Sequence, residues 1–312
     1  MNNWKNLCLA GLILCASASF AMPIASSARS MVPSEVQQVI GVDYRAIKDS
    51  PTAMALKQQV LPDNLKDLET ALKGIGIHVN SDLDQLTFAS FRTDKKGIQT
   101  IGVASGSFSA KAVLKRMKLK KIAATKYGTA AVYPMDNGFV MTFLDDNTLA
   151  FGTSDSLHSA LDTRDGKRPS LDSNPTMTDE MAAVDSAAVW SILDQKGTQA
   201  MMFSALGDAS KVADYESLKK RILASRYTMN FSSGVNLDLS VLTADSMTAA
   251  TLSTIVKAGM LYKKMSASPI EKTAIDATTV DSDSANVQLH FKSDDQKFQS
   301  LMHSPLFAAL SH

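Results

Sequence analysis

The chain has 312 residues, of which 45% are hydrophobic, and it carries 32 lysines and arginines against 31 aspartates and glutamates. This length and mixture indicate a globular protein with a large core and exclude a disordered chain. The near-zero net charge gives the whole chain no electrostatic reason to bind nucleic acid, so we expect no nucleic-acid partner.

Residues 1–21 are predicted to be a signal peptide. Lys5 supplies a positive charge, residues 7–20 form an apolar run, and small residues precede a cleavage site after Ala21, with an alternative site after Ala28. The apolar run is shorter than the ~20 residues that a membrane-spanning helix needs. We therefore expect an exported protein that is periplasmic or extracellular.

Both cysteines of the chain, Cys8 and Cys15, lie inside this signal. The mature chain is then free of cysteine. Three classes of protein are excluded for it, namely disulfide scaffolds, cysteine-ligated metal sites and cysteine nucleophiles.

A first α+β module is predicted over residues 31–165. Alternating and helical hydrophobic periodicities give broadly the order strand, helix, helix, strand, strand, helix, strand, strand, helix, and the first module has three strands rather than two before its last helix. The strands are expected at 39–44, 86–91, 97–103, 123–133, 138–144 and 148–153, and the helices begin near 52, 64, 109 and 156. Tight turns between neighbouring strands make those strands antiparallel.

A linker with Gly166, Pro169 and Pro175 is expected over residues 166–175, before a second module at 176–312. Its strands are expected at 187–193, 227–231, 235–241, 273–280 and 285–292, and its helices begin near 198, 215, 246 and 296. A turn at 281–284 is predicted to join the last two strands.

The two modules show the same order of elements. Twelve positions separate Gly97 from Ser109, and the same twelve separate Gly234 from Ser246, each serine opening a helix. We predict an internal duplication with an α+β fold. Each module is expected to be an antiparallel sheet with helices packed on one face, and a ligand is expected in the cleft between the modules.

The first module resembles a loose group of uncharacterised exported bacterial α+β proteins. The residues that carry this resemblance are Gly106-Ser107-Phe108 before a helix, Tyr127-Gly128 with Val132-Tyr133, and the segment at 144–149. The second module matches less well, since Ala244-Asp245 stands at the glycine position. The resemblance implies an envelope or secreted protein and no particular activity.

No reactive motif is found. Ser105 follows Gly102 without the G-x-S-x-G spacing of a nucleophile elbow, and the five histidines lack the spacing of a helical metal site. The acidic pairs at 145–146 and at Asp281 and Asp283 are assigned to turns. We expect no catalytic residue, no metal and no cofactor, although a hydrolase site assembled from distant Asp, His and Ser stays an alternative.

The most distinctive surface feature is a basic helix over residues 109–121. Ala110, Val113, Leu114 and Met117 form an apolar stripe that must face the core. The candidate ligand or partner surface consists of Lys111, Lys115, Arg116, Lys118, Lys120 and Lys121.

This surface favours a non-catalytic binding or structural protein of the envelope, whose partner is an envelope protein or an anionic surface. The alternative is an adaptor that contacts the membrane surface through the same helix.

Overall fold

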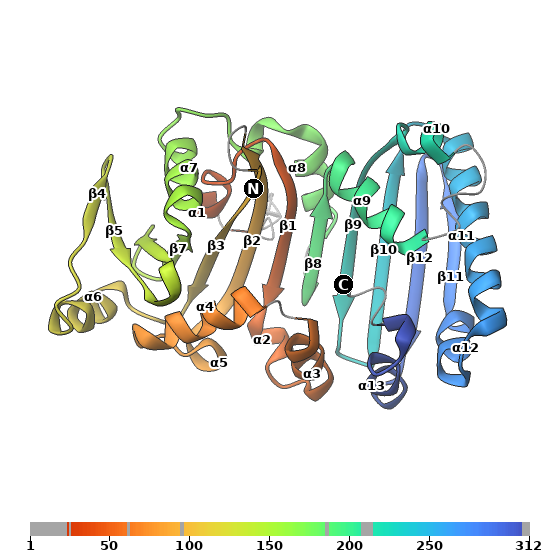
Figure 1. Cartoon of the computed structure of the whole chain (residues 1–312), viewed down its shortest axis with the longest axis horizontal. Coiled ribbons are helices and arrows are strands. Elements are labelled where there is room, and N and C mark those ends of the chain that lie inside the picture. The colour runs from red at the N-terminus through yellow and green to blue at the C-terminus, as the bar shows by residue number, and fades with distance from the viewer. Residues whose placement is uncertain are drawn as a thin grey trace, which may run out of the picture.

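The computed structural model describes residues 24, 26–60, 63–93, 97–184, 187–206 and 215–307 (Figure 1). The predicted signal peptide, residues 1–21, lies outside the described residues. No helix in the described part of the chain has both the length and the apolar character that crossing a bilayer requires.

A twelve-stranded sheet organises the described residues, in the order β11-β12-β10-β9-β8-β1-β2-β3-β7-β6-β5-β4. Every pair of neighbouring strands is antiparallel. The strands are β1 (Val36–Asp43), β2 (Leu83–Thr93), β3 (Gly97–Gly106), β4 (Thr125–Tyr127), β5 (Ala130–Pro134), β6 (Val140–Phe143), β7 (Thr148–Gly152), β8 (Val189–Leu193), β9 (Ile222–Asn230), β10 (Val235–Thr243), β11 (Thr278–Asp283) and β12 (Asn286–Ser293).

Helices precede, follow and connect these strands. They are α1 (Ser26–Arg29), α2 (Tyr44–Ile47), α3 (Pro51–Val60), α4 (Asp63–Gly74), α5 (Val79–Asp82), α6 (Ala110–Leu119), α7 (Ser154–Arg164), α8 (Pro175–Ala182), α9 (Gln195–Leu206), α10 (Tyr215–Lys219), α11 (Ser246–Ser266), α12 (Pro269–Asp276) and α13 (Asp295–Met302), with short 3-10 turns η1 (Asp136–Gly138) and η2 (Leu171–Ser173). The α+β class and the antiparallel pairing predicted from sequence are confirmed.

Two rows of cross-strand neighbours define the two faces of the sheet, because successive side chains in a strand point to opposite sides. Face A carries the apolar row Leu86, Val42, Val189, Met229, Leu237 and Phe291. Face B carries the row Thr87, Gly41, Trp190, Thr228, Asp238 and His290. In β9, β10 and β12, face A is therefore apolar and face B is largely polar.

The prediction that each module has helices on one face needs correction in both halves of the chain. In the first half, α4 and α6 pack on face A, whereas α7 packs on face B against Phe91 and Ile101. The reason is that β2 and β3 carry large apolar side chains at both odd and even positions, so both faces require cover. In the second half, α8 packs on face B over β8 and β9, whereas α9, α11, α12 and α13 pack with the apolar face A.

The two halves of the chain meet in one continuous sheet. Five residue pairs join β1 to β8, so continuous strand pairing lies where a cleft between the modules was expected. Outward from this seam the strand order is β1, β2, β3, β7, β6, β5, β4 on one side and β8, β9, β10, β12, β11 on the other. The internal duplication and the module boundaries stay predictions, which superposition of the two halves tests.

Two glycines let aromatic rings lie flat across neighbouring strands. Gly41 faces Trp190 across the seam, and a Cβ on Gly41 would lie 2.2 Å from the indole ring. Gly102 faces Phe151 in the same way, at 2.0 Å. Only glycine permits such close contact of a ring with the backbone, so these positions are fixed by packing.

Three local predictions were wrong at their boundaries. The expected strand 123–133 is a hairpin, β4–β5, that turns at Gly128, whose φ is +56°. The helix that the sequence predicts over 215–224 ends at Lys219, and the chain then enters β9. The expected strand 273–280 is helical as far as Asp276, because Pro269 and Glu271 form a strong helix start and the Glu271 carboxylate accepts from the Ser268 N–H at 2.7 Å.

Candidate functional site

Helix α6 is held on face A by its apolar stripe. Ser109 caps its start by accepting from the Ala112 N–H at 3.5 Å, and Ala110, Val113 and Met117 are buried. The predicted N-cap is thus confirmed, as are the core-facing positions of three stripe residues, whereas Leu114 is only partly buried. The opposite side of α6 is left to solvent. Figure 1 shows α6 beside the β4–β5 hairpin at one end of the sheet.

Three of the predicted surface residues, Lys111, Lys115 and Lys118, are exposed on this outer side. They stand four and three positions apart and therefore form one line along the helix. Among the described residues, no ion pair joins any of the three to a carboxylate. Leu119, beside them in sequence, is 77% exposed.

Arg116 and Lys120 are also exposed, and each donates a hydrogen bond to a backbone carbonyl near the end of α4. The Arg116 Nη1 donates to the Gly76 carbonyl at 2.6 Å, and the Lys120 Nζ donates to the Gly74 carbonyl at 2.7 Å. These carbonyls lie at the C-terminal end of α4, where a cation completes the hydrogen bonding and opposes the helix dipole. The two side chains therefore hold α6 against the end of α4, so the exposed lysines lie on a helix whose position is fixed.

The end of α6 borders an open hollow. Lys121 has φ +58°, and the Ile122 N–H donates to the Met117 carbonyl at 2.9 Å, so the chain turns sharply after the helix. A hollow of about 450 Å³ lies here, lined by Leu114, Lys118, Lys121, Ile122, Ala123 and Tyr133. We call Lys111, Lys115, Lys118, Lys121 and this hollow the basic surface. Its apolar members were not predicted as site residues.

The hairpin that supplies Tyr133 is fastened to α7 through Tyr127. The Tyr127 ring stacks on His158 with centroids 3.8 Å apart, and its hydroxyl donates to Asp162 at 2.9 Å. Lys167 also donates to Asp162, at 2.7 Å. Burial raises the pKa of Asp162, but these two hydrogen bonds and the Lys167 charge outweigh it and hold that pKa below its usual value.

We expect Asp162→Asn to lower the free energy of unfolding by about 1 kcal/mol at neutral pH, because a charged acceptor of two hydrogen bonds is lost. A lowered pKa in the folded state contributes stability above the unfolded value of about 3.9, and this contribution disappears as the pH falls through the folded pKa. Urea denaturation should therefore separate the variant from the wild type at pH 7 and bring the two together at low pH. A constant difference at all pH values would contradict this role.

The other polar residues considered from the sequence lie in strands and turns of the sheet. Ser105 lies within β3, and Asp145 forms a turn by accepting from the Asn147 N–H at 3.0 Å. Asp281 and Asp283 lie in β11, which corrects their assignment to a turn, since the chain reverses at 284–285 instead. His290 pairs with Asp238 across β12 and β10 at 2.5 Å. The described residues contain no group of three potential metal ligands.

Comparison with known proteins gives only distant structural neighbours. No protein family matches the chain, and no curated protein matches it. Crystal forms I, III and IV of TP0453 have TM-scores of 0.49, 0.49 and 0.47 at 8%, 10% and 9% identity. The matches cover 90%, 88% and 92% of this chain and 96%, 96% and 100% of those chains. A likeness of this degree implies no function.

Proposed function

We propose that this is an exported, non-catalytic binding protein that contacts an acidic segment of a protein partner through the basic surface. The observation that carries the proposal is the line of Lys111, Lys115 and Lys118, exposed on a helix that Arg116 and Lys120 fix to the end of α4. Like charges in a line repel one another, and a partner with the opposite charge relieves that repulsion.

The basic surface suits a protein segment better than a bilayer. An amphipathic helix binds a membrane by burying its apolar face among the lipids. The apolar face of α6 is instead buried against the sheet, with Val113 at 2% and Met117 at 1% exposure. The neighbouring hollow, whose lining includes Leu114 and Ile122, offers apolar surface to a side chain of a partner.

The core packing supports cleavage of the proposed signal after Ala21 rather than after Ala28. Ile24 and Ala28 are each 3% exposed and belong to the cluster that contains Val39 and Trp190. Cleavage after Ala28 would remove both side chains from that cluster. The export proposal therefore takes residues 22–312 as the mature chain, and N-terminal sequencing of the protein secreted by its native cells tests it.

A labelled peptide of glutamates around one leucine is expected to bind the protein, with an affinity that falls as salt is added. The triple variant Lys111→Glu, Lys115→Glu, Lys118→Glu should bind at least about tenfold more weakly, since each reversal replaces an attraction of about 1 kcal/mol in water by a repulsion. Fluorescence anisotropy at two salt concentrations measures both effects.

The matched control reverses three exposed lysines elsewhere, Lys48, Lys196 and Lys220, and changes the net charge equally. Its affinity should stay close to that of the wild type. Equal losses in both triple variants would show that only net charge matters and would contradict the proposal. Tighter binding to vesicles with anionic lipid than to the peptide would favour the membrane alternative instead.

A further inference from the structure

Helix α11 carries an unusual share of the exposed apolar surface. Four of the eight large apolar side chains that are exposed in the described part of the chain belong to it, namely Met247, Leu261, Tyr262 and Met265, at 79%, 67%, 72% and 81% exposure. The other four are spread over β3, α6, α9 and β9. Figure 1 shows α11 beside β11 at the outer end of the sheet. Exposed apolar side chains gathered on one element mark an interaction surface.

The exposed side of α11 has the spacing of a helix that pairs with another helix. Six exposed residues follow one another at alternating steps of four and three, which is the seven-residue repeat of a coiled coil. We call them the α11 ridge: Met247, Thr251, Thr254, Ala258, Leu261 and Met265. None of the six is charged. The hydroxyls of both threonines donate to backbone carbonyls four residues earlier in the same helix, at 2.9 Å, so their burial would leave no hydrogen bond unmade.

Each lysine of α11 lies near a carboxylate of the same chain. The ion pairs are Lys257 with Asp281 of β11, at 3.8 Å, and Lys264 with Asp276 of α12. Hydrogen bonds hold the pKa of Glu271 below its usual value, and the nearby charge of Lys263 contributes. A second copy of the chain can therefore approach the α11 ridge without repulsion between unbalanced cations, whereas an anionic bilayer would find each cation of this helix already balanced.

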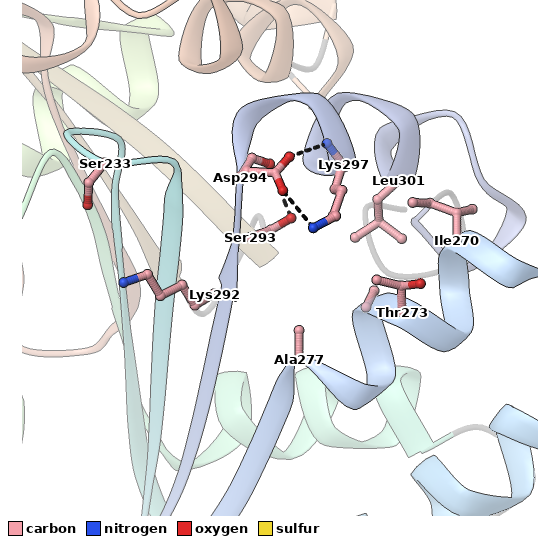
Figure 2. A pocket seen from close by; sticks show the side chains of 10 residues that line it. Ser233, Ile270, Thr273, Ala277, Lys292, Ser293, Asp294, Lys297 and Leu301 are labelled. Carbon is pink, nitrogen blue, oxygen red and sulfur yellow. Dashed lines mark hydrogen bonds and ion pairs between the residues drawn. The ribbon is translucent and has the colours of Figure 1, made fainter.

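The end of α11 that carries most of these apolar side chains has a fixed position. Helix α12 follows directly, and its Glu271 carboxylate accepts from the Ser268 N–H at 2.7 Å and from the Leu306 N–H at 2.8 Å. Helix α12 in turn packs on α13, where Ile270 lies beside Leu301 in the lining of a small cavity (Figure 2). The exposed side chains at 261, 262 and 265 therefore lie on a helix end that two further helices hold in place.

We infer that α11 pairs antiparallel with α11 of a second copy of this chain, in a symmetric dimer. In such a dimer the same surface of both copies forms the interface. Antiparallel pairing about residue 256 places Leu261 against the partner's Thr251, and Thr254 against the partner's Ala258, so small side chains let the helices approach closely. A parallel pair would set Leu261 against the partner's Leu261 and Thr251 against the partner's Thr251, which crowds one end and leaves the other loosely packed.

The dimer is expected to be weak. The α11 ridge is a strip about 30 Å long and about 10 Å wide by ideal helix dimensions. It supplies less than half of the about 800 Å² that each partner buries in a standard interface, so we expect a dissociation constant in the micromolar range. Helix α11 lies at the β11 end of the sheet and α6 at the β4 end, so both basic surfaces stay free in the dimer. The inference does not depend on the proposed function.

Sedimentation equilibrium of the proposed mature chain, residues 22–312, over micromolar to submillimolar concentrations tests the inference. The mass should rise from that of a monomer toward that of a dimer. The double variant Leu261→Glu, Met265→Glu should raise the dissociation constant at least about tenfold, because apolar burial is lost in both copies. The control Ile98→Glu, Phe203→Glu replaces two side chains that are 55% and 58% exposed elsewhere and should leave the constant unchanged. All four positions are exposed, and thermal unfolding checks that the fold is kept.

Disulfide cross-linking tests the orientation, because residues 22–312 contain no cysteine. A mixture of the Met247→Cys and Met265→Cys proteins should form a linked dimer under mild oxidation. Each protein alone should not, since its two cysteines would lie about 27 Å apart in an antiparallel pair, well beyond disulfide reach. Linkage of each variant with itself would contradict the antiparallel arrangement. A monomer at every concentration, a dimer that the α11 variant leaves intact, or a monomer that binds anionic vesicles through α11 would overturn the inference.

Discussion

Replacement of Trp190 by alanine is expected to lower the free energy of unfolding by about 3–5 kcal/mol, the usual cost of removing a large aromatic side chain from a core. Trp190 is 4% exposed and belongs to the cluster on face B that contains Val39 and Leu157. It also lies on β8 directly opposite Gly41 of β1, so its ring covers the seam between the two halves of the chain.

Urea denaturation measures this loss, and a double-mutant cycle with Gly41 tests its cause. Gly41→Ala alone should cost about 1–3 kcal/mol, because the new Cβ meets the indole ring. In the Trp190→Ala background the same substitution should cost much less, since the ring is absent. Additive effects would show that the two residues do not contact each other. Phe203→Ala is the control, because Phe203 is 58% exposed and its removal should change the stability by no more than about 0.5 kcal/mol.

The second large effect is expected at Asp194, for which alanine should lower the free energy of unfolding by about 2–4 kcal/mol. Its carboxylate accepts two hydrogen bonds from Arg92, at 2.7 and 3.1 Å, and one from the Gly197 N–H at 2.7 Å. The Arg92 and Asp194 side chains are 28% and 19% exposed. Alanine would leave the guanidinium without its partner and would remove a hydrogen bond at the start of α9.

Calorimetry or urea denaturation of Asp194→Ala, with Asp276→Ala as the control, measures this effect. Asp276 pairs with Lys264 at a more exposed site, with side-chain exposures of 59% and 37%, so its loss should cost at most about 1 kcal/mol. The double variant Arg92→Leu, Asp194→Ala should recover part of the stability, because no partnerless charge remains. Equal effects at Asp194 and Asp276 would show that the ion pair of Arg92 with Asp194, which connects β2 to the start of α9, adds no more stability than an exposed pair.

Local patterns predicted most of the elements. The apolar alternation at 235–241 and 285–292 is that of strands with one face on a core, and the structure has β10 and β12 there. The serine before Ala110 marked the start of α6. Errors arose where turn or cap chemistry was overlooked, as at Gly128 within a predicted strand and at Pro269 before α12.

Local sequence patterns could not predict which strands are neighbours in the sheet. Val39 pairs with Ile192, and the pattern around each residue indicates a strand without indicating its neighbour. A chain with two separate sheets and a chain with one continuous sheet would show the same hydrophobic pattern in each strand. The pairing of β1 with β8 is a long-range contact, and only the structure places it.

Sequence patterns were limited in the same way at the candidate site, where they predicted exposure but not contacts between elements. The lysines at 111, 115 and 118 were predicted from helical spacing alone, because exposure on an amphipathic helix follows from sequence. The contacts of Arg116 with Gly76 and of Lys120 with Gly74 depend on how α4 meets α6, and the helical pattern assigned both side chains to the surface. The hollow beside Lys121 depends on the β4–β5 hairpin and was missed for the same reason.

Hydrogen–deuterium exchange of the protein with and without the acidic peptide tests the proposed function most directly. Slower exchange is expected in α6 and the residues that follow it, 109–123, and no change is expected in the same region of the Lys111→Glu, Lys115→Glu, Lys118→Glu variant. Protection confined to another surface, or equal protection of 109–123 in the variant, would contradict binding through the basic surface.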